Sequence, residues 1–291
     1  MEYDEFTHIQ SKYDIKSLEI GVGLNEVDNL KPSDYFYKAV NESKTYYELA
    51  EKLQKHYATQ DLSNPSIKSM MECDIVSQRI AELINTNAFT LSHLALATIH
   101  RKLFKGLFSR NLAEFVGKFR TYNISKREPI LNGDSVVYAD NEDIEQNLEL
   151  IFKQYKQDFK QLNRNNIIEK TAEFISNIWQ IHPFVEGNTR TTAVFTIRML
   201  QSMGFQVNND IFKNNSKYFR NALVLDSYTN PLQNIGFDSS YLHSFFEKML
   251  FDKNLTLKPM PKNVYEKNII EINSTHIPKD IQIIKSKSPK R

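Results

Sequence analysis

Apolar positions recur at helical spacing on both sides of one short polar stretch, residues 182–190. Residues 191–203 downstream are apolar on nearly every face, which predicts a buried helix. Pro183 predicts the end of the upstream helix, because the residue before a proline is pushed out of the α region. The upstream apolar stripe spaced by three or four residues consists of Ile167, Thr171, Phe174, Ile175, Ile178 and Ile181.

The same periodicity predicts further helices over 34–57, 65–87, 91–107, 144–159, 214–226 and 239–251. Pro32-Ser33-Asp34 suits a helix start, and Gly204 is expected to stop the buried helix. In the helix at 91–107 we expect Leu94 to face inward. Residues 1–31 show little periodicity, and their pair Gly21 and Gly23 is interpreted as a turn.

One segment departs from the helical pattern. Residues 129–138 read as a short β-hairpin with Asn132-Gly133 at its turn, because this dipeptide favours the tight turns that join antiparallel strands. The chain is therefore expected to be all-α, or mostly helical, with one small β-hairpin.

Composition narrows the class of protein. The 291 residues carry 41% hydrophobic and 25% charged side chains, which is ordinary for a globular protein. The net charge of +2 argues against nucleic acid as the main partner. A single cysteine, Cys73, excludes an internal disulfide. We find no long apolar run and no signal peptide, so we expect a cytoplasmic protein without a membrane partner.

The polar stretch before the buried helix holds the candidate chemistry. Free amides at a helix start bind anions such as phosphate, and Gly187 lets the backbone approach a ligand closely. Asn188 can cap the helix or contact a phosphate, and Arg190 offers a fork of donors. Glu186 suits Mg²⁺, and His182 suits a general base. Together they predict a phosphate-transfer centre.

The run His182-Pro-Phe-Val-Glu-Gly-Asn-Thr-Arg190 resembles the signature of Fic-domain proteins, and the chain from about Leu91 to Leu250 is similar to them too. The resemblance implies transfer of AMP from ATP, with Mg²⁺, to a Tyr, Thr or Ser hydroxyl of a target protein. It implies His182 as general base, Phe184 as core anchor and Glu186 as Mg²⁺ ligand. The phosphate-binding residues that it implies are Gly187, Asn188, Thr189 and Arg190.

The resemblance also implies a domain plan. Residues 1–88 would form an N-terminal helical accessory region, 89–258 the Fic domain, and 259–291 a C-terminal extension with a basic tail at 285–291. The hairpin would be a flap that lies over the active-site loop and pairs with the target. Its docking residues would be Lys126, Ile130 and Leu131. Tyr218, Phe219 and Asp226 would line a pocket for the base of the nucleotide, or would simply pack.

Two departures from the family pattern bear on the donor and on regulation. Thr189 stands where the family usually has Gly or Lys. Ala193 stands where many members carry a second arginine, which the resemblance implies would hold the terminal phosphate of ATP and pair with an inhibitory glutamate. Another nucleotide, or a diphosphate-linked group, is thus an alternative donor.

Regulation has two readings. Ser77 and Glu82 resemble the family's inhibitory helix with one residue too many between them, or they belong to an ordinary core helix. A separate inhibitory partner is also compatible with the sequence.

Two further alternatives concern the whole chain and its histidines. A protein-binding module without catalysis would not need His182, Glu186, Asn188 and Arg190 together.

His93 and His100 lie seven residues apart on one helical face and could ligate a metal. No third ligand is spaced to join them, so we expect hydrogen-bonded core histidines.

Overall fold

The computed structural model describes residues 13–86 and 88–265, and this part of the chain is mostly helical, as predicted. Its N-terminal helices are α1 (Ile15–Asn25), α2 (Asp34–Asn41), α3 (Tyr46–Ala58) and α4 (Pro65–Ile84). The remaining helices are α5 (His93–Phe104), α6 (Arg110–Ala113), α7 (Ile144–Asp158), α8 (Ile167–Ile181), α9 (Asn188–Ser202), α10 (Asp210–Ser227) and α11 (Ser240–Leu250). Short 3₁₀ turns occur at η2 (Glu26–Asp28), η3 (Pro129–Leu131), η4 (Asn141–Asp143), η5 (Phe159–Gln161) and η6 (Pro231–Gln233).

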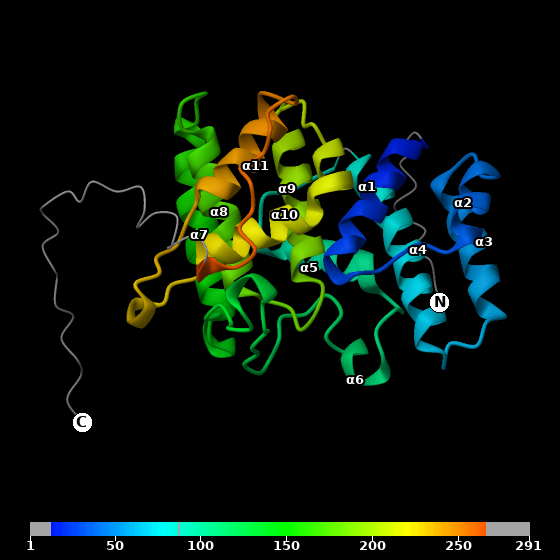
Figure 1. Ribbon diagram of the computed structural model, residues 1–291. Helices are drawn as coiled ribbons and strands as arrows, with labels where there is room; N and C mark the ends of the chain where they lie inside the picture. Colours follow the sequence, from blue (N-terminus) through cyan, green and yellow to red (C-terminus); the bar gives the residue numbers. More distant parts are fainter. Residues whose placement is uncertain (1–12, 87, 266–291) are drawn as a thin grey trace, which may run out of the picture.

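Helix α9 lies at the centre of the molecule (Figure 1). Every residue from Asn188 to Leu200 is buried, the polar ones included, which agrees with the prediction of a buried helix. It packs against α5 and α8, and also against α4 and α1 of the N-terminal region. The start of α9, where the candidate chemistry lies, is therefore enclosed by several helices distant in sequence.

The N-terminal helices share one apolar core with the rest of the chain. Helix α1 packs on α4 and on α10, and α4 packs on α9, so contacts cross the predicted boundary at residue 88. The division into three regions stays a prediction. The basic tail at 285–291 lies outside the described residues.

Glycines 21 and 23, interpreted from sequence as a turn, lie inside α1. A Cβ atom on Gly21 would lie 2.5 Å from the carbonyl oxygen of Ser77, and one on Gly23 would lie 2.5 Å from Lys213 Cα. The missing side chains thus allow α1 to approach α4 and α10 closely. The turn interpretation was wrong because packing, and not backbone conformation, requires these glycines.

The predicted hairpin has its turn but lacks strands. Asn132 adopts the left-handed conformation with φ 57°, and Gly133 has φ 91°. Pro129 instead begins the 3₁₀ turn η3, and the described part of the chain contains no β ladder in this segment. The Glu128 amide donates to the Asp134 carbonyl, which closes the loop. We call residues 126–139 the flap segment.

Two smaller differences concern the helices. The helix expected over 34–57 is two helices, because the chain breaks between Asn41 and Tyr46. Leu94 was expected to face inward, but it lies on the exposed side of α5 and is 61% exposed. No helix in the described ranges is long and apolar enough to cross a membrane.

Candidate active site

The loop from His182 to Gly187 joins α8 to α9 and is held by two residues in the left-handed region. His182 ends α8 with φ 50°, and Gly187 precedes α9 with φ 76°. A Cβ atom at Gly187 would lie 2.4 Å from the Phe104 ring, so glycine is required by conformation and by space. The free amides at the start of α9 lie directly after this glycine.

Arg120, which precedes the flap segment in the sequence, stabilises the loop between α8 and α9 through hydrogen bonds from its guanidinium. Its Nε donates to the carbonyl of His182 at 2.9 Å, and its Nη1 donates to the carbonyl of Tyr122 at 2.9 Å. Its Nη2 contacts the carbonyls of Ala139 and Ile181. A buried guanidinium at the C-terminal end of α8 satisfies free carbonyls there and complements the helix dipole.

His100 holds the loop from α5. Its Nε2 donates to the Glu186 carbonyl at 2.9 Å, and its Nδ1 accepts from the Gly117 amide at 2.9 Å. The ring stacks on Phe184, with centroids 4.0 Å apart. Burial lowers the pKa of His100 to about 4, so the ring is neutral and has a structural role. The expectation of a hydrogen-bonded core histidine is confirmed at this position.

The imidazole of His182 is buried, and one of its two nitrogens has no hydrogen-bond partner among the described residues. Its Nδ1 lies 3.1 Å from the Trp179 carbonyl, which can only accept, so Nδ1 carries the proton. Nε2 then keeps its lone pair, and no group within the described residues hydrogen-bonds to it. Burial, aided by Lys126, holds the pKa of His182 well below its usual value.

Tyr138 covers the His182 ring. The two rings stack with centroids 4.1 Å apart, and Trp179 meets the imidazole edge-on at 5.1 Å. The Tyr138 hydroxyl is also buried, with no partner in the described part of the chain. The Tyr138 ring of the flap segment therefore lies against the imidazole in this structure.

Glu186 and Lys126 meet at the mouth of the loop. Glu186 Oε2 lies 3.0 Å from Lys126 Nζ, and the Glu186 side chain is 47% exposed. A single accessible carboxylate suits Mg²⁺, which commonly binds one or two protein carboxylates together with substrate phosphates. Lys126 would have to move away from Glu186 Oε2 before this oxygen could bind a metal cation.

Asn188 and Thr189 are engaged inside the protein. The Asn188 side chain accepts from the Phe184 amide at 2.9 Å and donates to the Phe184 carbonyl at 2.7 Å. Thr189 Oγ1 accepts from the Trp179 indole at 3.0 Å. Both side chains thus fix the loop, and the groups left to meet a phosphate are the backbone amides at the start of α9.

Arg190 is buried in an acidic setting that comes from the N-terminal helices. Its Nε lies 2.9 Å from Asp28 Oδ2 as an ion pair, although this nitrogen is not aligned for a hydrogen bond. Its Nη2 donates to Glu72 at 2.9 Å and its Nη1 donates to Asn25 at 2.9 Å. We call Asp28 and Glu72 the acidic clamp. The guanidinium also lies over the Phe104 ring at 4.7 Å.

A second arginine extends this network and was missed from the sequence. Arg220 of α10 forms a two-pronged pair with the buried Glu128, at 2.9 and 3.1 Å, and lies 3.7 Å from Asp28 Oδ1. It therefore joins the flap segment to the acidic clamp. No local motif marks Arg220, Asp28 or Glu72, so only the folded chain brings them together.

The two residues predicted to regulate the site differ in position. Ser77 is buried, and its Oγ accepts from Asn25, which also binds Arg190. Glu82 instead accepts from Gln78 at 3.0 Å, within α4 itself. The glutamate of α4 that contacts Arg190 is Glu72, one of the two residues of the acidic clamp.

The remaining predicted site residues do not gather at the loop. Tyr218 and Phe219 pack toward Phe245 of α11, with centroids 6.3 and 4.9 Å away, which agrees with the packing alternative. Asp226 is partly buried near the end of α10. In the flap segment Ile130 and Leu131 are buried, so their side chains do not face a target, whereas Val137 is 81% exposed.

Comparison with known proteins gives a family match for the central part of the chain. Residues 90–200 match the model of the Fic/DOC family. No curated protein matches the chain. One solved structure similar to this chain is the N-terminal Fic domain of a Bartonella effector protein (Bep) from Bartonella sp. AR 15-3, described as a substrate of the VirB T4SS. It aligns with TM-score 0.47 and 17% identity over 63% of this chain and 83% of that chain. The stretch of the chain that contains His182, Glu186 and Arg190 thus matches the Fic/DOC family.

Proposed function

We propose that the chain is a Fic-type transferase that moves AMP from ATP to a hydroxyl side chain of a target protein. The observation that carries the proposal is the state of His182, whose Nδ1 faces the Trp179 carbonyl while Nε2 keeps an unpaired lone pair. A neutral imidazole held in this tautomer is what a general base requires.

The chemistry follows from the position of the loop. The target hydroxyl gives its proton to His182 Nε2 as its oxygen attacks the α-phosphorus, and pyrophosphate leaves. The amides at the start of α9 and the Arg190 guanidinium would stabilise the negative charge that grows on the phosphates. Glu186 would hold Mg²⁺, which neutralises phosphate charge when bound.

Two contacts must change before this reaction. Nε2 of His182 is buried, so the flap segment, whose Tyr138 ring stacks on the imidazole, has to move before a hydroxyl can reach this nitrogen. Arg190 has to exchange Asp28 and Glu72 for phosphate oxygens. The structure is therefore interpreted as a closed state, in which the flap segment and the acidic clamp occupy the groups that a nucleotide and target would use.

The test is transfer of label from α-labelled ATP to proteins of a cell lysate by the full chain with Mg²⁺. We expect a labelled band that disappears with His182→Ala and persists with His243→Ala, a histidine of α11. Equal labelling by His182→Ala and the unaltered chain would remove His182 from the mechanism. If neither labelling nor nucleotide binding is found, the non-catalytic binding module is favoured.

A different donor is a second candidate, favoured by Ala193. Ala193 is fully buried and lies one helical turn after Arg190. Its side chain carries no positive charge that could bind a third phosphate. A thermal-shift panel of nucleotides separates the two candidates, because a ligand that binds only the folded state raises its melting temperature. A larger shift with another nucleotide than with ATP would favour the alternative donor.

A further inference from the structure

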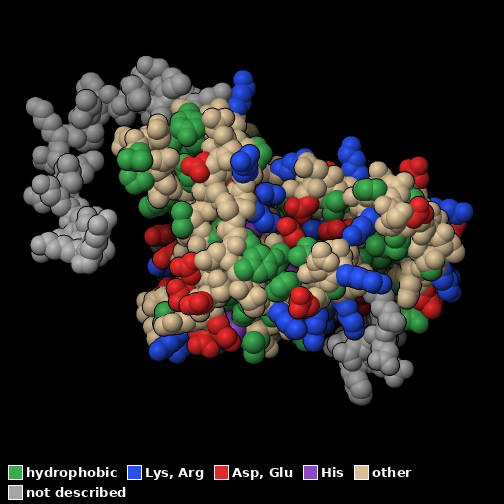
Figure 2. Space-filling view, turned by 90° about the horizontal axis from the view of Figure 1, so that it is seen from below, with side chains coloured by type: hydrophobic (Ala, Val, Ile, Leu, Met, Phe, Trp, Pro, Cys, Tyr) green, Lys and Arg blue, Asp and Glu red, His purple; other side chains and the backbone are tan. Residues whose placement is uncertain are grey.

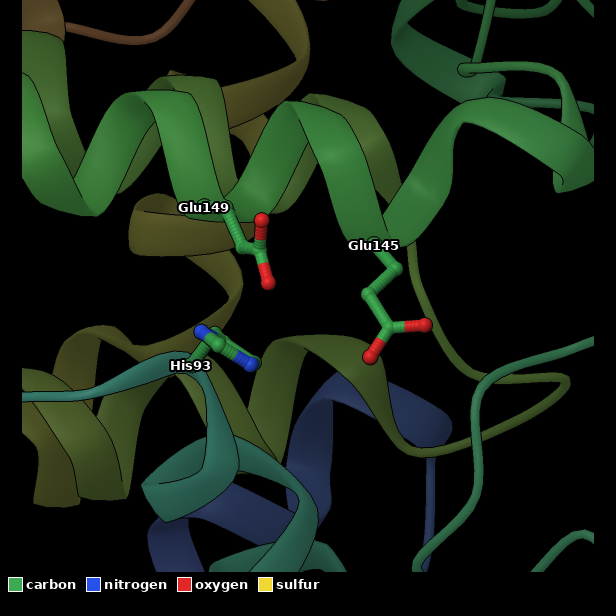
Figure 3. A group of neighbouring side chains, drawn as sticks. All are labelled: His93, Glu145 and Glu149. Carbon is green, nitrogen blue, oxygen red and sulfur yellow. The ribbon is translucent and has the colours of Figure 1, made fainter.

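The two helices α5 and α7 bring together three potential metal ligands away from the loop at residues 182–190. They are His93, in the first turn of α5, and Glu145 and Glu149, one turn apart on α7 (Figure 3). One ligand atom of each lies within 4.8 Å of one from each of the other two. Within the described ranges, this is the one such group of three or more.

The sequence concealed this group because its members are distant from one another. His93 and His100 were considered as a pair, but His100 is used inside the core by Glu186 and Gly117. The ligands that His93 lacked are 52 and 56 residues further along the chain, on the helix α7. Folding supplies the two carboxylates.

The two carboxylates of this group have no ion-pair partner among the described residues. Glu145 and Glu149 are four residues apart on one helix, where like charges repel. Neither carboxylate, nor the His93 imidazole, forms a hydrogen bond or ion pair in the part of the chain that the structure describes. Acidic side chains also gather at the left-hand end of the molecule in Figure 2, the end where α7 lies in Figure 1. A cation between the two helices would offset this repulsion.

The donor types indicate which cation fits. An imidazole with two carboxylates is a nitrogen and oxygen set typical of zinc-class ions, whereas Mg²⁺ and Ca²⁺ prefer oxygen alone. The ring of His93 is braced edge-on by Phe152, with centroids 6.2 Å apart, while both carboxylates are exposed and can turn inward. Figure 3 shows the three side chains reaching toward one another from the facing helices.

We propose that His93, Glu145 and Glu149 bind one Zn²⁺ ion, with water completing its coordination. The ion would join α5 to α7. Because α5 also carries His100 and Phe104, which contact the loop at Glu186 and Gly187, the ion would stabilise the scaffold behind that loop. The site is separate from the Mg²⁺ position proposed at Glu186 and does not depend on the proposed transferase activity.

The test is calorimetric titration of untagged, EDTA-treated full-length protein with ZnCl₂. We expect one equivalent to bind, and the dissociation constant to rise on the order of tenfold or more in His93→Ala, Glu145→Gln and Glu149→Gln. His243→Ala and Glu114→Gln change the same residue types elsewhere, and Glu186→Gln changes the proposed Mg²⁺ ligand. These three should bind zinc as the unaltered chain does.

X-ray absorption at the zinc edge provides a second, independent measurement. A first shell of nitrogen and oxygen with one imidazole supports the site, whereas a sulfur ligand would implicate Cys73, which is buried. Circular dichroism checks that each variant is folded. The proposal is overturned if no zinc binds, or if the three cluster variants bind zinc as tightly as the controls.

Discussion

At the scale of single residues, the loop depends on positions where one side chain serves several purposes. Gly187 provides a left-handed turn and also leaves room for Phe104. His100 bonds through both nitrogens and stacks on Phe184. These residues position the loop, and they leave Nε2 of His182 without a hydrogen-bond partner among the described residues.

Gly187→Ala should destabilise the fold more than the same change at Gly204. Gly204 also has positive φ, at 84°, but nothing lies within 4 Å of its would-be Cβ. Left-handed alanine costs about 1–2 kcal/mol, and we expect that loss at Gly204. At Gly187 the clash with Phe104 adds roughly 1–3 kcal/mol. Urea unfolding measures both, and equal losses would show that the Phe104 contact relaxes freely.

His100 should make the protein sensitive to acid. Its pKa is about 4 when folded and near 6.5 when unfolded, so the unfolded chain binds the proton more tightly between these values. The contribution of neutral, buried His100 to the free energy of unfolding is therefore complete above pH 6.5, and it is lost as the pH falls toward 4. The difference corresponds to about 3 kcal/mol.

The measurement for this prediction is the free energy of unfolding in urea at pH 7 and pH 4.5. His100→Gln, which keeps a donor for the Glu186 carbonyl, should show a smaller fall than the unaltered chain. Asp74, whose pKa burial raises to about 6, contributes with the opposite sign but is present in both proteins. An identical fall in both would mean that His100 titrates normally in the folded state.

At the scale of elements, the predictions succeeded where the signal is local. The apolar stripe and Pro183 predicted α8, including its end at Ile181, and the aliphatic run predicted α9. The flap segment was harder, because Asn132-Gly133 marks a turn but does not decide what flanks it. Pro129 starts a 3₁₀ turn, and Ile130 and Leu131 enter the core instead of alternating between two faces.

The flap segment should protect His182 through the Tyr138 ring. Tyr138→Ala removes the ring that stacks on the imidazole, so Nε2 should become accessible to diethyl pyrocarbonate, an imidazole reagent. Tyr138→Phe keeps the ring and loses a buried hydroxyl that has no partner in the described residues, so it should remain protected and fully stable. Peptide mapping follows modification at His182. Equal reactivity of the two variants would show that the ring does not control access.

At the scale of the whole molecule, the N-terminal helices complete the site and do not merely cover it. Arg190 binds Glu72, 118 residues away, and Asn25, 165 residues away. Such partners carry no spacing signal, so the sequence indicated the arginine but not the acids that surround it. The predicted regulatory glutamate, Glu82, lies on the same helix as Glu72 but contacts Gln78 instead.

The acidic clamp should restrict nucleotide binding, because Asp28 and Glu72 occupy the Arg190 guanidinium that a phosphate would bind. In the double variant Asp28→Asn, Glu72→Gln both negative charges facing Arg190 are removed while the side-chain shapes are kept. The fold should lose about 1–3 kcal/mol, because the buried Arg190 guanidinium loses the two carboxylates that pair with it. Freed from its acids, Arg190 should bind a non-hydrolysable ATP analogue with Mg²⁺ roughly tenfold more tightly, as a gain of about 1.4 kcal/mol implies.

Calorimetry measures the affinity of the clamp variant, and Glu19→Gln is the matched control on α1. It removes a carboxylate that pairs with Lys213 at 2.7 Å but is 46% exposed and does not contact Arg190. Exposed pairs contribute little, so this variant should match the unaltered chain in stability and affinity. Weaker nucleotide binding by the clamp variant would mean that Asp28 and Glu72 hold Arg190 in its binding position. The clamp would then assemble the site and not restrict it.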